Sequence, residues 1–264
     1  MIIAQISDTH ISLPGQGPDS RYATAEHLAR AVGHLNALPQ RPDLVLLTGD
    51  LVDQGSAEEY RRLRELLAPL AIPLHLIPGN HDDRENLRAA FPDHAYLPAT
   101  GFLHYVIEAG PIRLIGLDTH VPGEPTGLLC DARLAWLDAR LAEARDRPTV
   151  LFMHHPPFVT GLGAMDAMGL EGSDGFARVV GGYDQVERVL CGHLHRPIMR
   201  RFHGTVVCTS PATAHQIALD LGEPNRLALI MEPPACLLHV WSPVTGLVTH
   251  TSYIGDFGAP TVLR

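Results

Sequence analysis

Side chains that bind divalent metals stand at the ends of several apolar runs in this sequence. In residues 78–83 a Pro-Gly pair ends a strand-like run, and an amide (Asn80), an imidazole (His81) and two carboxylates follow. Nitrogen and oxygen donors without a thiolate suit Zn, Mn, Fe or Co. The turn indicates metal chemistry, although a polar loop with satisfied hydrogen bonds would have the same composition.

Four further stretches repeat this design of an apolar run, a stop and metal-type ligands. They end in Asp8 and His10, in Asp50, in His154 and His155, and in His193 and His195. In an extended segment, residues two apart project to the same side, so each D-x-H or H-x-H pair can serve one site. A pair of divalent ions needs several donors and a shared group, and a carboxylate such as Asp50 can give one oxygen to each ion.

The blocks D-x-H, G-D, G-N-H-D, H-H and G-H-x-H, in this order from Asp8 to His195, resemble the calcineurin-like metallophosphoesterase family. The resemblance implies two divalent ions (Fe, Mn, Zn or Co) that share Asp50 as a bridge. One ion would be held by Asp8, His10, Asp50 and His195, and the other by Asp50, Asn80, His154 and His193. A closed structural zinc site is the alternative, but it would use only four ligands.

The same resemblance implies a metal-dependent phosphoric diester hydrolase. A hydroxide bridging the two ions would attack phosphorus, because a bound divalent cation can lower the pKa of water to ~7. His81 is not assigned to a metal, so it would act in catalysis by hydrogen-bonding the phosphoryl group or protonating the leaving oxygen. A purely supporting role for His81 is the alternative.

Two further histidines are candidates for the substrate pocket. His215 follows a strand in the second half and resembles a pocket position of the same family. His155 is also placed in the pocket, with the alternative that it orients a ligand imidazole, as Asp82, Asp83 or Asp118 could.

Residues 154–157, with Gly161, Met165 and Asp166, resemble the bacterial class III cyclic-nucleotide phosphodiesterases and their glycerophosphodiesterase relatives. The resemblance implies small phosphodiesters as substrates, 3′,5′-cyclic nucleotides such as cAMP first, with a glycerophosphodiester as the alternative. No base-reading motif is visible in the sequence. A non-catalytic metal-binding scaffold and a nuclease remain as further, less favoured functions.

The composition indicates which partners and which cellular compartment to expect. The 264 residues carry a formal net charge of −9 without an Arg/Lys cluster, which argues against binding long nucleic acid. No run approaches the ~18 to 20 apolar residues that span a bilayer, so no membrane association is expected. Four widely spaced cysteines and a strand that starts at once, without a leader, predict a cytoplasmic protein.

Strands alternate with amphipathic helices, which predicts an α/β fold. Residues 43–48 indicate a buried strand, Thr24 and Asp131 are expected to cap helices, and Ser56 with Glu59 forms a capping box. The family resemblance implies a four-layer α/β/β/α sandwich. We expect a single domain over residues 1–264, in which 1–200 carry the motifs.

The last third of the sequence changes character. Residues 156–175 are rich in Gly and Pro and are expected to form a loop over the site. Residues 201–264 contain short β-like runs, and we expect this β-rich extension to complete the second sheet. Its apolar segments from 235 to 254 predict contacts between copies, and hence a homo-oligomer.

Overall fold

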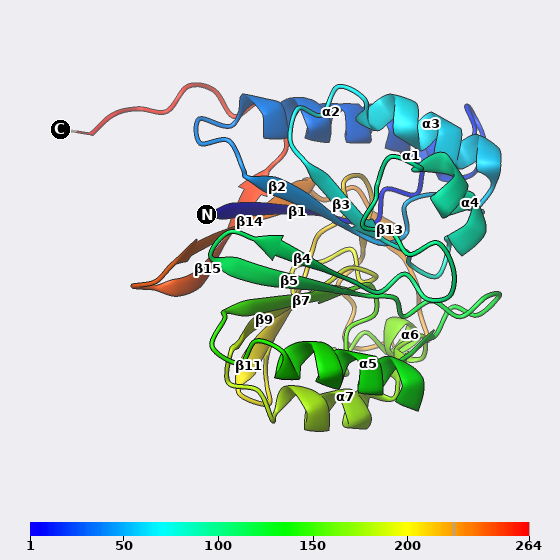
Figure 1. Cartoon of the computed structure of the whole chain (residues 1–264). Coiled ribbons are helices and arrows are strands. Elements are labelled where there is room, and N and C mark those ends of the chain that lie inside the picture. Colours follow the sequence, from blue (N-terminus) through cyan, green and yellow to red (C-terminus); the bar gives the residue numbers. More distant parts are fainter. Residues whose placement is uncertain (224, 264) are drawn as a thin grey trace.

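Two β-sheets lie face to face in the computed structural model, which describes residues 1–223 and 225–263 (Figure 1). The first sheet has the order β15-β14-β1-β2-β3 and the second β10-β11-β9-β7-β5-β4. The strands of the first sheet are β1 (Ile2–Ile6), β2 (Leu44–Thr48), β3 (Leu74–Ile77), β14 (Ala235–Ser242) and β15 (Gly246–Tyr253). Those of the second are β4 (Tyr105–Ala109), β5 (Ile112–Leu117), β7 (Thr149–Met153), β9 (Val186–Cys191), β10 (Met199–Phe202) and β11 (Thr205–Thr209).

Helices cover the outer face of each sheet, which confirms the predicted four-layer α/β/β/α sandwich (Figure 1). Beside the first sheet lie α1 (Gly17–Tyr22), α2 (Thr24–Ala37), α3 (Ala57–Leu67) and α4 (Arg84–Ala90). Beside the second lie α5 (Asp131–Ala142) and α7 (Ser173–Val180). The remaining elements are α6 (Gly163–Asp166) and two small strand pairs, β6 (Gly127–Leu128) with β8 (Leu170–Glu171) and β12 (Gln216–Ile217) with β13 (Leu229–Ile230).

The apolar core has two main parts, one on each side of the first sheet. Leu28 and Leu35 of α2 and Tyr60 of α3 pack on its outer face. Between the sheets and beneath α5 and α7, large side chains such as Phe152 and Phe176 are fully buried. Each such side chain contributes roughly 1.5–3 kcal/mol by burial, so the layers form a rigid support.

Helix starts were predicted with mixed success. The capping box is confirmed: Glu59 N donates to Ser56 Oγ (3.3 Å) and Ser56 N to Glu59 Oε2 (3.1 Å). The caps expected at Thr24 and Asp131 are wrong, because both are the first helical residues and the cap positions fall on Ala23 and Cys130. Thr24 is fully buried, and its Oγ1 has no hydrogen-bond partner among the described residues.

The C-terminal strands divide between the two sheets, which corrects the expectation that residues 201–264 complete only the second. β10 and β11 do extend the second sheet. β14, however, pairs antiparallel with β1, and β15 pairs with β14. The inner residues of β14 are buried, so this strand covers an edge of β1 that would otherwise expose backbone groups.

The strands that carry the ligand motifs run parallel within each sheet. β1, β2 and β3 are parallel neighbours, as are β5, β7, β9 and β11. Their carboxyl ends therefore meet along one edge of the sandwich. Among the residues that the structure describes, no helix is long and apolar enough to cross a membrane.

Candidate metal centre

Every ligand named from the sequence stands one to four residues beyond the carboxyl end of a strand. Asp8 and His10 follow β1, Asp50 follows β2 and Asn80 follows β3. From the second sheet, His154 follows β7, and His193 and His195 follow β9. The structure brings all of these side chains together at one end of the sandwich, although residues from 8 to 195 contribute.

The backbone is unusual at five of these positions. The φ angles are +54° at Asp8, +43° at His10, +48° at Asp50, +69° at His193 and +49° at His195. Positive φ is uncommon for residues other than glycine and is concentrated at functional sites. The loops are thus bent so that both sheets turn their polar side chains toward the same centre.

Two glycines allow the ligand loops to approach each other. A Cβ on Gly49, whose φ is +90°, would lie 2.4 Å from His154 Nδ1, and one on Gly79 would lie 2.2 Å from Asp50 Oδ1. Atoms cannot approach this closely without displacement of the loop. The glycine in each G-D and G-N-H-D block is therefore required by packing around Asp50.

Asp50 occupies the middle of the cluster. Its Oδ2 lies 3.5 Å from His10 Nε2 and 3.3 Å from His154 Nε2. In one group of donors, His195 Nε2 is 3.1 Å from His10 Nε2 and 3.4 Å from Asp8 Oδ1. In a second group, Asn80 Oδ1 is 3.2 Å from His154 Nε2. A single carboxylate thus faces two separate groups of donors.

Hydrogen bonds orient the ligand imidazoles. His154 Nδ1 donates to Thr48 O (2.8 Å) and His195 Nδ1 donates to His215 O (2.9 Å), so each Nε2 is directed into the centre. His193 Nε2 is buried and has no hydrogen-bond partner among the described residues. A buried nitrogen lone pair without a partner is costly, and a bound cation would satisfy it.

The charges around the centre favour a cation. Burial opposes ionisation of Asp50, but the nearby imidazoles of His154 and His81 outweigh it and hold the pKa of Asp50 well below its usual value. Burial likewise disfavours a charged His154, yet Asp50 outweighs it and raises the pKa of His154 to about 9. The buried carboxylates thus attract positive charge, which a metal ion supplies.

The donors fit two divalent ions, as expected for a binuclear centre. Asp8, His10, Asp50 and His195 lie within one ligand-sized group. Asn80, His154 and the orphan Nε2 of His193 lie on the other side of Asp50. The assignment of each ligand to one ion stays a prediction.

His81 lies at the entrance to this centre. Its backbone N donates to Asp50 Oδ1 (3.0 Å), and its Nδ1 donates to Asp53 O (2.8 Å). The side chain is 37% exposed, and its ring centroid is 4.7 Å from that of His10. Nε2 is therefore the ring nitrogen available to a bound molecule. Asp53, which no sequence motif marked, holds the ring in this orientation.

A cavity of about 290 Å³ opens over the centre, and Asp50, Asn80, His81 and His193 are among its lining residues. His215 also lines it, as predicted for a pocket residue, and its ring stacks on Tyr22 with centroids 4.6 Å apart. Met165 from the Gly-rich segment lines it as well. This segment lies over the site as expected, but it contains α6, β8 and the start of α7 and is not one continuous loop.

His155 lies behind the centre and is not among the residues that line this cavity. Its Nε2 donates to Pro125 O (3.1 Å), and Thr119 Oγ1 donates to its Nδ1 (2.8 Å). The ring packs 4.6 Å from that of His193 between centroids. Both nitrogens are used within the protein, so the structure gives His155 the supporting position that was the alternative to a pocket role.

Of the expected supporting carboxylates, Asp82 contacts the ligand loops directly. It accepts hydrogen bonds from the backbone N of Gly79 (2.7 Å) and of Leu51 (3.1 Å), and from Tyr60 Oη (2.8 Å). Asp82 thereby joins the loop of Asp50 to the loop of Asn80. Tyr60 is a buried residue of α3, and no sequence motif marked its hydroxyl.

Asp83 and Asp118 lie farther from the centre. Asp83 caps α4 by accepting from Asn86 N (2.8 Å). Asp118 pairs with Arg84, whose Nε and Nη2 donate to its two carboxylate oxygens at 2.5 and 2.9 Å. This fork holds the segment after β5 and occupies the guanidinium group.

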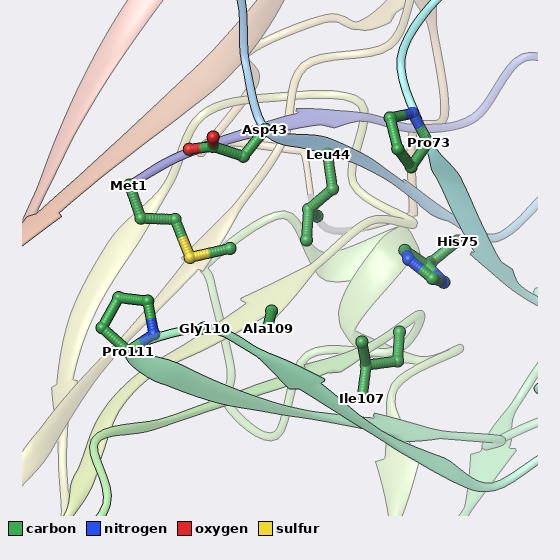
Figure 2. A pocket seen from close by; sticks show the side chains of 9 residues that line it. All are labelled: Met1, Asp43, Leu44, Pro73, His75, Ile107, Ala109, Gly110 and Pro111. Carbon is green, nitrogen blue, oxygen red and sulfur yellow. The ribbon is translucent and has the colours of Figure 1, made fainter.

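A larger cavity of about 570 Å³ lies at the opposite end of the sheets (Figure 2). Its lining is mostly apolar or backbone, with Met1, Leu44, Pro73 and Ile107 around it, and Asp43 and His75 as its titratable groups. No group of three or more metal-type ligands is found there among the described residues.

Comparisons with known proteins are consistent with the metal centre described above. A family model described as calcineurin-like phosphoesterase matches residues 1–197. A probable glycerophosphodiester phosphodiesterase GpdQ of Arcobacter nitrofigilis is 40% identical over 98% of this chain and 96% of that protein. A probable cyclic nucleotide phosphodiesterase of Rhodopseudomonas palustris is 38% identical over 87% of this chain and 84% of that protein.

A more distant relative and a solved structure extend the comparison. The 3′,5′-cyclic adenosine monophosphate phosphodiesterase CpdA of Pseudomonas aeruginosa is 31% identical over 83% of this chain and 78% of that protein. The crystal structure of a dimetal phosphatase from Danio rerio superposes with a TM-score of 0.65 at 14% identity, covering 97% of this chain and 99% of that one. At this identity the likeness supports the fold alone.

Proposed function

This chain belongs to the calcineurin-like phosphoesterase family, and from that premise we propose that it hydrolyses small phosphodiesters, 3′,5′-cyclic nucleotides such as cAMP first among them. It is a metal-dependent phosphoric diester hydrolase. Relatives named for glycerophosphodiesters and for cyclic nucleotides both cover most of the chain, so the two substrates are the proposal and its alternative.

The observation that carries the preference for diesters is the absence of a fixed cation near the centre. None of the described residues that line the cavity is an arginine, and the sequence contains no lysine. Arg84, which follows the G-N-H-D block, is bound to Asp118, and Arg196, which follows His195, is bound to Glu232 and to the backbone O of Ile217. A phosphomonoester dianion is commonly held by a guanidinium fork, whereas a diester carries one negative charge and needs less compensation.

The residues have distinct roles in this proposal. Asp8, His10, Asp50, Asn80, His154, His193 and His195 would hold the two divalent ions. When bound, the ions neutralise phosphoryl oxygens and activate water. His81, held through Nδ1 by Asp53 O, presents Nε2 to the cavity. His81 would use Nε2 to hydrogen-bond a phosphoryl oxygen or to pass a proton to the leaving oxygen, and the fixed Nδ1 contact keeps Nε2 in position.

Kinetics on four compounds test the proposal: bis(p-nitrophenyl) phosphate, p-nitrophenyl phosphate, 3′,5′-cyclic AMP and glycerophosphoethanolamine. With Mn-loaded protein we expect a higher kcat/KM for bis(p-nitrophenyl) phosphate than for the monoester, and hydrolysis of cyclic AMP. Preference for the monoester would overturn the diester assignment. Cleavage of the glycerol diester without cyclic AMP would establish the alternative substrate.

We further propose that copies of the chain associate through β15. This strand forms an edge of the first sheet over eight residues, and Val248 and Tyr253 on it are exposed. A long edge strand with apolar side chains pairs readily with another strand. Light scattering at micromolar concentration should give a multiple of the chain mass, and Val248→Lys should lower it. A monomer mass for the unaltered chain would refute this assembly.

A further inference from the structure

Five of the residues that line the catalytic cavity have large apolar side chains, and we call them the apolar wall. They come from α6 and the turn after it and from the β12–β13 pair with the segment before β13. The wall consists of Met165, Met168, Ile217, Leu227 and Leu229.

The wall has a fixed base and an open outer part. Met165 and Ile217 are buried and pack with Leu162 and Leu194 in a small separate cluster, against which Met168 also packs. Leu227 and Leu229, in contrast, are 51% and 41% exposed although both line the cavity. Both therefore combine a place in the cavity lining with apolar surface that a bound molecule can cover.

The polar side chains that line the cavity are assigned metal ligands or lie beside one, as Asp53, His81 and His215 lie beside His10. The described wall residues carry no hydroxyl, amide or charged side chain that could bind a polar arm. A glycerol arm placed against the buried base of the wall would lose water from its hydroxyl groups without gaining a hydrogen bond from these side chains, which is unfavourable. An aromatic or apolar arm would instead bury surface at roughly 25 cal/mol per Å², with added contacts between methionine sulfur and the ring.

We propose that the apolar wall binds the second arm of the diester and selects a flat aromatic or apolar group, such as an aryl ring or a nucleobase, over glycerol. This inference rests on the proposed diesterase function and assigns its specificity to residues outside the metal-ligand motifs. Leu229 and Leu227 are the wall residues that are both partly exposed and part of the lining, and Leu229 is the one whose strand also offers a control position.

The small sheet provides a matched control. Leu229 pairs with Ile217 and the next residue, Ile230, pairs with Gln216. Successive residues of a strand point to opposite faces, and Ile230 is not among the cavity residues although it is 43% exposed. Leu229→Ser and Ile230→Ser therefore remove similar apolar side chains from the same strand, but only the first alters the wall.

The test uses the full, metal-loaded chain and two diesters with the same p-nitrophenolate leaving group. Their second arm is phenyl in one and 2,3-dihydroxypropyl in the other, and each kcat/KM is divided by the rate of uncatalysed hydrolysis. We expect the phenyl diester to be preferred, and Leu229→Ser to lower its kcat/KM about 10-fold, mainly through KM. The dihydroxypropyl diester should change less than about two-fold in Leu229→Ser, and Ile230→Ser should leave both unchanged.

Other outcomes separate this inference from the function on which it rests. Equal use of the two diesters by the unaltered chain, or equal losses in Leu229→Ser and Ile230→Ser, would overturn the role of the wall while leaving the diesterase function intact. Cleavage of neither diester by protein with two bound metals would contradict the proposed function itself. If Leu229→Ser does not fold by circular dichroism, Leu227→Ser gives the same test outside the strand.

Discussion

The two ends of the sandwich contain cavities of opposite character. The one at the carboxyl ends of β1, β2 and β3 has about half the volume of the other, 290 against 570 Å³, but contains the ligand cluster. The larger one has Asp43 and His75 as its titratable side chains. Volume alone would therefore point to the wrong end of the molecule, whereas converging donors identify the site.

The difference follows from how the loops use their polar groups. At the opposite end, Asp43 Oδ2 accepts from the backbone N of Ile2 at 2.7 Å, so this carboxylate fixes the start of β1 beside β2. At the catalytic end, Asp50 is directed away from its own strand by a positive φ, and its Oδ2 faces the imidazoles of His10 and His154. One carboxylate supports the fold, and the other is available for ligands.

The largest expected effect comes from removing these two carboxylates, one at a time. Asp50→Ala should remove both ions, because both share its carboxylate, and should lower kcat/KM on a diester by at least about 10³-fold. Asp43→Ala should keep two metals per chain and full activity, with a loss of about 1 kcal/mol in unfolding free energy. Elemental analysis measures the metal content, and denaturant titration measures the free energy of unfolding. Two tightly bound metals in Asp50→Ala would refute the role of Asp50 as a ligand shared by both ions.

A smaller effect is expected at His81, which contacts the cavity but is not assigned to an ion. His81→Ala should retain both metals and lose about 10²- to 10⁴-fold in kcat, as for a residue that transfers a proton. Asn80→Ala should instead lower the affinity for the ion assigned to Asp50, Asn80, His154 and His193. An unchanged rate in His81→Ala, with metal content verified, would reassign His81 to packing.

A third substitution separates support from catalysis. Tyr60→Phe removes the hydroxyl that donates to Asp82 and accepts from Asp83 N. The ligand loops should then be held less firmly, with metal affinity lower by about 10-fold and a free energy of unfolding lower by about 1–3 kcal/mol. At saturating metal the rate should return to that of the unaltered chain. A rate that stays low at saturating metal would place Tyr60 in the reaction instead.

The ligand blocks could be predicted from sequence because each is local: an apolar run and then a short motif, as in Gly79-Asn80-His81-Asp82. The fold followed because parallel strands place such motifs at one edge. Features set by distant contacts could not be predicted. These include the pairing of β14 with β1, the contact of Asp53 with His81, and the position of Leu229 in the cavity, which depends on a strand pair formed across eleven intervening residues.

The smallest expected effect lies at the opposite end, in the pH dependence of stability. Burial, together with the charge of His94, lowers the pKa of His75 to about 4, and its Nδ1 has no partner among the described residues. Below about pH 6.5 the unfolded chain binds a proton at this position that the folded chain does not bind until about pH 4. This histidine therefore lowers the free energy of unfolding as the pH falls from about 6.5 to about 4.

His75→Phe should remove this contribution and keep the aromatic contact with Tyr96, whose ring centroid is 4.7 Å away. We expect the variant to equal the unaltered chain at pH 8, to be more stable than it by less than about 2 kcal/mol at pH 5, and to keep the same kcat/KM at both values. Denaturant titrations at the two pH values measure the difference. Because the metal centre is unchanged in both proteins, its own titration cancels in this comparison, and a loss of activity in His75→Phe would show instead that the two ends of the sandwich are coupled.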